Sequence, residues 1–503
     1  MFKNALVSVS DKTGLVDFLR LYAQKGMRIL STGGTAQHLK ENGFQVVDVS
    51  EQTGFPEVMG GRVKTLHPNI HMCLLSRPDH PEDFELLKKQ SLEPIDLLVC
   101  NLYPFEQAVL KNSSYEELIE NIDIGGPSLL RGAAKNHQQV TVVCDPADYK
   151  WISERESLEL KDRLRLAAKV FAHVSSYDSL IAQELGAGWG QKLSLGGEKV
   201  FDLRYGENPH QGASWYRLPG QKMGLETAEI LQGKPLSYNN ILDLDAASCL
   251  VRELSDFACV AVKHNNPCGV AQDKTVLGAV QKSIGADPVS VFGGILAING
   301  KVDAASAEVM SKIFLECVIA PDYEPKALEI FSQKKNLRIL KWAQMNKAQK
   351  SFEVKTVTGG WLIQHADQYG SETAEWKFLG EKPDEKVIKN LVFAEKVCSA
   401  LKSNAIAIIQ NEQTVGLGMG QVNRVDAVQH AVDRMKAHHA IVEDAVLASD
   451  AFFPFPDSIE KAHQAGIKWI LQPGGSVSDE QVFARARELG INMVITGMRH
   501  FRH

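Results

Sequence analysis

A lysine, a histidine and two asparagines follow one short apolar run, and together these residue types could carry out proton transfer. The run covers residues 258–262, and Lys263-His264-Asn265-Asn266-Pro267-Cys268-Gly269 comes directly after it. Histidine titrates near neutral pH and can accept a proton from a nucleophile, while a neighbouring ammonium keeps it neutral and stabilises negative charge. The apolar run predicts a buried strand that ends at the Pro and the Gly. The alternative is an ordinary strand-to-turn junction with a surface lysine and a capping histidine.

A second candidate site is the turn Ser31-Thr32-Gly33-Gly34-Thr35, which precedes a predicted helix over residues 36–41. Paired glycines let several main-chain N–H groups point at one anion, the three hydroxyls add donors, and the helix N-terminus adds a positive field. The turn has neither the Gly-Lys-Ser/Thr of a Walker A loop nor the glycine spacing of dinucleotide-binding folds. It predicts a phosphate site, and a tight turn without a ligand is the alternative.

Further polar residues of the N-terminal third lie in turns beyond predicted strands. A long loop rich in Gly and Pro, residues 53–68, is of the length that is usually functional inside a compact domain. Ligands of open α/β sheets bind beyond the carboxyl ends of the strands. Candidate residues in these turns are Arg62, Lys64, Thr65, Asn101, Tyr103, Asp123 and Lys135. Any one of them alone is compatible with a solvated surface residue.

Predicted strands and helices alternate in this third, which indicates a parallel α/β sheet. The strands are expected at residues 5–9, 27–30, 46–49, 96–100 and 140–143, and the helices at 15–25, 36–41 and 128–134. Ser10 or Asp11 is the expected N-cap of the first helix. Two more helices are expected at residues 163–170 and 172–185, followed by a linker at 193–197.

Composition limits the class of protein. The chain has 503 residues, which suggests about three domains, and it is 44% hydrophobic and 23% charged. A net charge of −6 with scattered Lys and Arg argues against a nucleic-acid-binding protein. None of the eight cysteines forms a Cys-x-x-Cys pair, and no apolar signal core or 18-residue apolar run occurs. We therefore expect a soluble cytoplasmic protein that does not bind membranes.

The N-terminal motifs resemble those of a known domain. The runs SDKTGL, STGGT, TGFPEVMGGRVKTLHP, NLYPF and IDIGGPSLLRGAAKNH are similar to the inosine monophosphate (IMP) cyclohydrolase domain of bifunctional purine-biosynthesis proteins. The phosphate turn is also similar to that of methylglyoxal synthases. The resemblance implies that residues 31–35 hold the phosphate and that Arg62, Thr65 and Asn101 bind the substrate. It implies that Lys64 and Lys135 stabilise a carbonyl oxygen, and that Tyr103 and Asp123 move protons.

Later motifs extend the resemblance over the whole chain. The runs RYGENPHQ, KHNNPCG, SNAIAI, GMGQVNRV, SDAFFPFPD and QPGGS resemble the transformylase domain of the same proteins, which acts on aminoimidazole carboxamide ribonucleotide (AICAR). The resemblance implies that His264 is the base, that Lys263 tunes its charge, and that Asn404 donates to the oxyanion of the tetrahedral intermediate. The implied substrate contacts are Arg204, Tyr205, Asn239, Phe292, Gly293, Arg424, Phe452, Arg499, Phe501 and His503. The aromatic cluster could instead be core, and the terminal residues could be frayed.

A weak internal repeat is visible in the second part of the chain. In residues 250–271 and 391–410 a predicted helix leads to Lys-x-Asn and a small apolar stretch, at Lys263-His264-Asn265 and Lys402-Ser403-Asn404. Two such segments do not prove a duplication, but the resemblance implies two cytidine-deaminase-like units. The expected domains are residues 1–196, with a methylglyoxal-synthase-like fold, and 197–503, divided into about 197–370 and 371–503.

The implied function is bifunctional. The chain would transfer a formyl group from the cosubstrate 10-formyltetrahydrofolate to AICAR, and then close the formylated AICAR to IMP with loss of water. No metal is required by this chemistry, and the zinc ligands of deaminases are absent from residues 197–503, since no His-x-Glu occurs there and Cys268 lacks a second Cys. A homodimer is expected, with the transformylase site between subunits. A regulatory protein that senses a phosphorylated ligand is the alternative class, although it would not need Lys263, His264 and Asn404 in one pocket.

Overall fold

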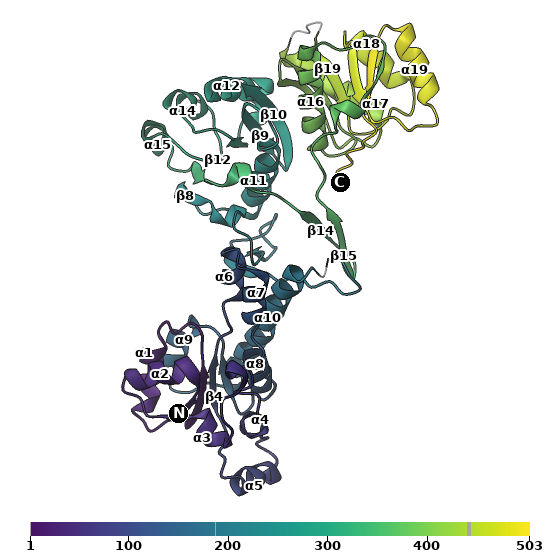
Figure 1. Ribbon diagram of the computed structural model, residues 1–503. Coiled ribbons are helices and arrows are strands. Elements are labelled where there is room, and N and C mark those ends of the chain that lie inside the picture. The colour runs from purple at the N-terminus through teal and green to yellow at the C-terminus, as the bar shows by residue number, and fades with distance from the viewer. Residues whose placement is uncertain (1, 187, 440–443) are drawn as a thin grey trace. The chain divides into compact units, whose positions relative to one another are not determined.

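The computed structural model of the protein describes residues 2–186, 188–439 and 444–503, drawn in Figure 1. The chain forms two compact units. The first contains the residues up to Glu198 together with Tyr216–Lys222, and the second contains Lys199–Trp215 and Met223–His503. Residue 187, within the predicted helical and linker stretch, lies outside the described residues.

The first unit is built on a five-stranded parallel sheet with the order β3-β2-β1-β4-β5. The strands are β1 (Asn4–Ser8), β2 (Arg28–Ser31), β3 (Val46–Asp48), β4 (Leu97–Cys100) and β5 (Thr141–Val143). Every residue of β4 and β5 is buried. A parallel sheet covered on both faces needs such continuous apolar strands, so the predicted alternation and fold class are confirmed.

Helices cover both faces of this sheet (Figure 1). They are α1 (Leu15–Ala23), α2 (Gly33–Glu41), α3 (Val49–Thr53), α4 (Pro68–Leu75), α5 (Pro81–Lys89), α6 (Phe105–Leu110), α7 (Tyr115–Glu120), α8 (Gly125–Lys135), α9 (Asp148–Ser153) and α10 (Leu160–Glu184), with a 3₁₀ turn η1 (Met59–Gly61). Gly14, with φ 67°, precedes α1, so the predicted cap at Ser10 or Asp11 is wrong. The two helices predicted between residues 163 and 185 are one helix, α10, because no Gly or Pro interrupts that stretch.

The second unit contains a twelve-stranded mixed sheet with the order β16-β21-β20-β19-β17-β18-β10-β9-β11-β12-β13-β8. Its first half comprises β8 (Glu229–Gln232), α11 (Tyr238–Val251), β9 (Phe257–Lys263), β10 (Asn266–Asp273), α12 (Val276–Ala286), α13 (Pro288–Val291), β11 (Ile295–Ile298), α14 (Ala304–Ser311), β12 (Cys317–Ala320), α15 (Pro325–Ser332) and β13 (Arg338–Lys341). Its second half comprises β16 (Lys377–Leu379), α16 (Glu385–Ser399), β17 (Ile406–Gln410), β18 (Gln413–Gly418), α17 (Arg424–His438), β19 (Val446–Ser449), α18 (Asp457–Gln464), β20 (Trp469–Gln472), α19 (Asp479–Glu488) and β21 (Asn492–Ile495).

Smaller elements connect these parts. Two two-stranded sheets are formed by β6 (Glu198–Leu203) with β7 (Ala213–Arg217), and by β14 (Phe352–Val357) with β15 (Gly360–His365). Three further 3₁₀ turns are η2 (Leu225–Thr227), η3 (Met345–Lys347) and η4 (Thr373–Glu375). The strands β14 and β15 lie between the two halves of the second unit in sequence. No described helix is both long and apolar enough to cross a membrane.

The two halves of the second unit share one topology. In each, a helix precedes an antiparallel hairpin, and the next strand pairs antiparallel with the first hairpin strand and parallel with its successor. The halves meet where β10 pairs antiparallel with β18. The duplication that the sequence suggested is therefore present in the topology. The predicted correspondence of the two Lys-x-Asn segments is wrong, because Lys263 ends β9 whereas Lys402 precedes β17.

The hairpin turns show which positions do correspond. His264 and Asn265 join β9 to β10, Asn411 and Glu412 join β17 to β18, and all four have positive φ. The strand was expected to stop at Pro267 and Gly269, but the chain reverses at His264 and continues through these residues as β10. A Cβ at position 269 would lie 2.2 Å from the carbonyl oxygen of Ser283, so the close approach of α12 requires glycine there.

Candidate active sites

A cavity of about 940 Å³ opens at the carboxyl edge of the five-stranded sheet. Its wall comes from the residues after β1, β2 and β4, from the loop around η1 and from the start of α8. The predicted site residues that line it are Thr32, Gly34, Thr35, Arg62, Lys64, Thr65, Asn101, Tyr103 and Asp123. This is the edge at which open α/β sheets bind ligands.

The phosphate turn forms the first turn of α2. Thr32 is the N-cap, with extended backbone and no capping bond from its side chain, so the first amides of α2 stay available to an anion. The hydroxyls of Ser31 and Thr35 are used within the protein, since Ser31 donates to the carbonyl of Val7 (2.7 Å) and Thr35 donates to that of Val9 (2.9 Å). Main-chain amides and Thr32, rather than three hydroxyls, are the donors that remain.

Lys64 brings a positive charge to this turn. A Cβ built on Gly33, which has φ 54°, would lie only 3.1 Å from Nζ of Lys64. The ammonium group therefore lies against the first turn of α2, where it adds to the positive field of the helix N-terminus. Thr65 is buried, and its hydroxyl lies against Gly125 at the start of α8.

Asp123 and Tyr103 form the acid–base part of the cavity. The Asp123 carboxylate accepts hydrogen bonds from the main-chain N–H of Gly126 (2.8 Å) and of Tyr103 (3.3 Å). Burial raises the pKa of Asp123 in spite of these bonds and of the nearby Lys64 charge. Burial, and then the Asp123 charge, raise the pKa of the Tyr103 phenol. A carboxyl group with a raised pKa is suited to exchange a proton at neutral pH.

Two residues that support this site were not identified from the sequence. The hydroxyl of Tyr177 on α10 accepts from the N–H of Asp123 (2.8 Å) and donates to the carbonyl of Asn121 (3.0 Å). Lys12 lines the cavity. Tyr177 gave no signal, because it lies within a helix far along the chain. Lys12 belongs to the SDKTGL motif, which could have indicated it.

Three predicted residues are placed differently from the others. Arg62, at the cavity rim, pairs with Glu120. Asn101 accepts from the N–H groups of Ser10 (2.6 Å) and Asp11 (3.0 Å), so its side chain fixes the loop after β1. Lys135 is exposed at the C-terminal end of α8, whereas the cavity lies at the N-terminal end of that helix.

The second candidate site is the turn between β9 and β10. Lys263 donates from Nζ to the carbonyl of Phe292 (2.8 Å), and the N–H of Asn265 donates to Asp243 on α11 (2.6 Å). His264 is exposed at the tip of the turn. Lys263 and His264 line a cavity of about 270 Å³ together with Cys268 and residues of β18 and α17. The imidazole is therefore presented to solvent by a turn that is fixed on both sides.

Asn404 is held by a buried network in the second half. The Arg424 guanidinium, which is 6% exposed, donates to Oδ1 of Asn404 (2.6 Å) and to Oγ of Ser449 (2.8 Å), and it pairs with Asp450. Nδ2 of Asn404 donates to the carbonyl of Gln421 (2.9 Å). Arg424 therefore orients the amide of Asn404 and neutralises the buried carboxylate of Asp450.

Two segments far apart in sequence meet beside the His264 turn. The N–H of Lys402 donates to Oδ1 of Asn266 (3.4 Å), which brings residues 402–404 to the start of β10. The two Lys-x-Asn segments are therefore neighbours in space, although they occupy non-equivalent positions of the two halves.

The other predicted substrate contacts are spread over the second unit. Arg204 lies over the Tyr205 ring (5.6 Å), and Asn239 donates to the carbonyl of Glu207 (3.5 Å). Phe292 is 57% exposed beside Phe314, and the N–H of Gly293 donates to the carbonyl of Phe314 (2.8 Å). The remaining contacts are Phe452, which is half-buried, Arg499, which lies over the Phe501 ring (4.4 Å), and His503, whose ring lies 5.8 Å from that of Phe501.

One chain does not bring these residues to the His264 cavity. That cavity is lined by Lys263 and His264 alone among the predicted residues, and Phe501 and His503 line a different cavity. Within the described residues, no three His, Cys, Asp or Glu side chains are grouped so that they could hold a metal ion.

Comparison with known proteins matches both parts of the chain. A family model described as AICARFT/IMPCHase bienzyme matches residues 133–434, and one described as an MGS-like domain matches residues 14–128. The chain is 47% identical over 516 residues to the bifunctional purine biosynthesis protein PurH of Caldicellulosiruptor saccharolyticus, with 100% of both chains covered. The protein of the same name from Persephonella marina is 46% identical over 517 residues, again with 100% of both covered. That of Bacillus subtilis is 47% identical over 513 residues, covering 100% of this chain and 99% of its own.

Proposed function

Because the chain belongs to the AICARFT/IMPCHase bienzyme family, we propose that its two reactions take place at the two sites described above. The protein is a bifunctional enzyme of purine biosynthesis, with AICAR formyltransferase and IMP cyclohydrolase activities. The cavity of the first unit carries out the cyclisation to IMP. The turn between β9 and β10 carries out formyl transfer, with 10-formyltetrahydrofolate as the formyl donor.

In the cyclisation, the carboxamide nitrogen of formylated AICAR attacks the formyl carbon of the same molecule, and water leaves. The amides of the first turn of α2 bind the phosphate and so fix the substrate. Lys64 stabilises the negative charge that develops on oxygen, and Asp123 and Tyr103 exchange the protons. Lys135 remains a predicted contributor that lies outside the cavity. The barrier falls largely because both reacting groups are held in one oriented molecule.

In the formyl transfer, the 5-amino group of AICAR is a poor nucleophile and must lose a proton as it attacks the formyl carbon. His264 accepts this proton, and the neighbouring ammonium of Lys263 assists the departing folate nitrogen. An amide NH₂ has two donors, and the bond from Asn404 to Gln421 uses one of them. The other is available to the oxyanion of the tetrahedral intermediate. When the intermediate collapses, the bond between the formyl carbon and the folate nitrogen breaks, that nitrogen takes up the proton held by His264, and tetrahydrofolate leaves.

The transformylase site is completed by a second copy of the chain. This proposal is supported by where the predicted contacts lie. In one chain, the cavity of His264 is lined by none of Arg204, Tyr205, Asn239, Phe452 and Arg499. A homodimer would supply these residues from the partner, and it would also supply contacts for the folate.

One observation carries the assignment of the cyclisation site: Lys64, Asp123 and the N-terminus of α2 line one cavity. In a sensor of a phosphorylated ligand, the phosphate turn would be sufficient. The combination of a fixed cation with a carboxyl of raised pKa is what a proton-transfer reaction requires.

Replacing Lys64 tests the assignment. We expect Lys64→Ala to slow cyclisation by about a hundredfold or more while formyl transfer continues, so that formylated AICAR accumulates and is detected by chromatography. Lys40→Ala is the matched control. Lys40 is exposed in the last turn of α2, the helix whose first turn Lys64 contacts, and it does not line the cyclisation cavity. Equal loss of both activities in Lys64→Ala would contradict separate sites.

A further inference from the structure

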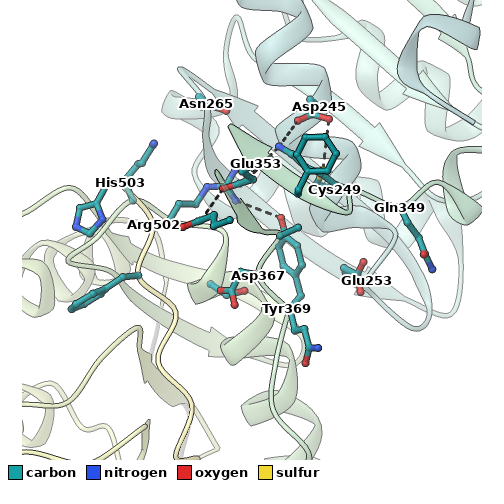
Figure 2. Close-up of a pocket in the computed structure, with 18 of the residues that line it drawn as sticks. Asp245, Cys249, Glu253, Asn265, Gln349, Glu353, Asp367, Tyr369, Arg502 and His503 are labelled. Atoms are coloured by element: carbon teal, nitrogen blue, oxygen red, sulfur yellow. Dashed lines mark hydrogen bonds and ion pairs between the residues drawn. The ribbon is translucent and has the colours of Figure 1, made fainter. Parts of the chain in front are cut away.

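A cavity of about 750 Å³ in the second unit (Figure 2) differs from the two cavities assigned to the reactions, and of the predicted substrate contacts only Phe501 and His503 line it. It lies between α11, the β14–β15 hairpin, the segment 366–370, Lys402 and the last residues of the chain. Figure 2 shows Asp245 and Cys249 of α11 facing Arg502, Tyr369 and Glu353 across this space. A cavity of this size accommodates a small organic molecule.

Three of the four carboxylates that line the cavity have ion-pair partners, and Glu253 has none within the described residues. Asp245 and Glu353 both pair with Lys350, at 3.3 Å and 3.4 Å. Asp367 pairs with the ring of His500 at 2.9 Å. Neighbouring bases therefore compensate these three acidic groups, although the charge of Glu353 also acts on Lys402 and Arg502 without forming an ion pair with either.

Three cations of the cavity lack such a partner. Arg252, Lys402 and Arg502 form no ion pair with a carboxylate in the described parts of the chain, residues 2–186, 188–439 and 444–503. Arg252 donates to Sγ of Cys249 (3.1 Å), and its Nε is buried without a hydrogen-bond partner. Arg502 has only the hydroxyl of Tyr369, at 3.4 Å, as a side-chain partner within the described residues.

The cations also repel one another. Burial, and then the charges of Arg502 and Lys355, lower the pKa of Lys402. The ammonium of Lys355 itself donates to the main-chain oxygen of His503 (2.7 Å). Partly buried like charges without counter-charges cost free energy, and a bound anion would recover it. Walls of low dielectric constant concentrate the field of such a cluster inside the cavity.

We infer that this cavity is a binding site for an organic oxyanion, whose phosphate or carboxylate group is held by Lys402, Arg502 and Arg252. Tyr369 and Phe501 provide flat walls for the body of the ligand. The site is separate from the cyclisation cavity. It reaches the formyl-transfer turn, because the N–H of Lys402 is bonded to Asn266 and because Asn265 lines the cavity.

The test is isothermal titration of the full chain with inorganic phosphate and, separately, with glutarate. Phosphate should occupy this cavity in addition to the sites that bind the substrate phosphates, one of which is the turn before α2. In Lys402→Met the affinity of one site should fall at least tenfold, while the others are unchanged. The control Lys326→Met, at an exposed lysine of α15, should retain all of the sites. A second variant, Arg502→Met, should repeat the loss, and its melting temperature shows whether it has folded.

The two probes separate the possible sources of the anion. Phosphate binding that depends on Lys402 identifies a phosphate ester, and glutarate binding that depends on Lys402 identifies a carboxylate. If neither probe binds in a Lys402-dependent way, the inference is overturned. If phosphate does not bind at the α2 turn but still binds in a Lys402-dependent way, the proposed cyclisation site is contradicted and this inference is supported.

Discussion

The main-chain N–H of Asn265 donates a 2.6 Å hydrogen bond to the side chain of Asp243 on α11. The bond holds the turn that carries His264, in which both residues have positive φ, a conformation that costs a non-glycine residue free energy. In the second half of the unit, the N–H of Glu412 donates to Asn390, and both bonds span 22 residues. A carboxylate and an amide oxygen thus fix the same turn in the two halves.

This equivalence predicts the behaviour of two substitutions at position 243. Asp243→Asn keeps an acceptor of the kind that Asn390 supplies, so we expect formyl transfer within about threefold of wild type. Asp243→Ala removes the acceptor and lets the turn move. A displacement of about 1 Å can cost up to a hundredfold in rate, so we expect at least a tenfold loss. Folate absorbance follows formyl transfer, and cyclisation should be unchanged in both variants. Equal rates in the two variants would contradict the role of this bond.

Much of the first unit could be predicted from the sequence, because each buried parallel strand is a continuous apolar run that ends in Gly or polar residues. The strand at Leu97–Cys100 was expected within one residue of its observed start. The repeat was harder, since Lys-x-Asn occurs at non-equivalent positions of the two halves. The two halves are correctly aligned at their two hairpin turns, whose residues have positive φ. Neither a Glu at position 412 nor a His at position 264 predicts that conformation from the sequence.

The sequence predicted which residues form the candidate site, but not which groups their side chains bond to. Lys64 and Asp123 line one cavity as expected. The sequence could not show that Ser31 bonds to the adjacent strand, nor that Arg424 is buried against Asp450. Those bonds depend on three-dimensional packing between segments, and a motif does not contain that information.

Removing the imidazole of His264 should abolish formyl transfer without unfolding the protein. His264→Asn is the preferred variant, because asparagine tolerates positive φ and keeps the turn. We expect kcat to fall by roughly a hundredfold to ten-thousandfold, with nucleotide affinity within a few fold. The residue is exposed, so the melting temperature should stay close to that of wild type.

The structural alternative for His264 gives a different result. If its ring only stabilised the strand end, His264→Asn would lower the melting temperature, and activity would fall only in proportion to the folded protein. A variant that keeps more than about a tenth of the wild-type kcat would exclude His264 as the base, given the usual contribution of a general base. Asn411→Ala, in the equivalent turn of the other half, controls for turn strain.

The boundary of the cyclohydrolase unit can be tested with two fragments. We expect residues 1–196 to cyclise formylated AICAR, and residues 1–222 to do so with a higher melting temperature. The reason is that the added segment pairs Arg217 with Glu106 (2.6 Å) and donates from the N–H of Gly220 to the same carboxylate (2.9 Å). A half-buried carboxylate without these partners destabilises the shorter fragment. If the longer fragment is folded but inactive, the site does not belong to this unit alone.

Stability of the second unit should depend on pH through His500. The ring lies between Asp367 (2.9 Å) and Glu395 (3.6 Å) and is 3% exposed. Burial alone would lower its pKa, but the hydrogen bond to Asp367 and the ion pair with Glu395 outweigh this and raise the pKa of His500 to about 9. Because the folded pKa is above the unfolded value of about 6.5, the stabilisation is complete below that pH and is lost as pH rises through 9.

Calorimetry at a series of pH values checks this expectation. Between pH 6.5 and 9.5 the wild-type transition of the second unit should lose on the order of 2 to 3 kcal/mol, which corresponds to a decrease of roughly 3 to 6 °C in melting temperature. His500→Asn should melt lower at pH 6.5 and show a much flatter curve across this window, because it has no charge to lose. His463→Asn, at an exposed histidine of α18, should keep the wild-type slope. An unchanged slope in His500→Asn would show that the ion pairs of His500 contribute little to the folded state.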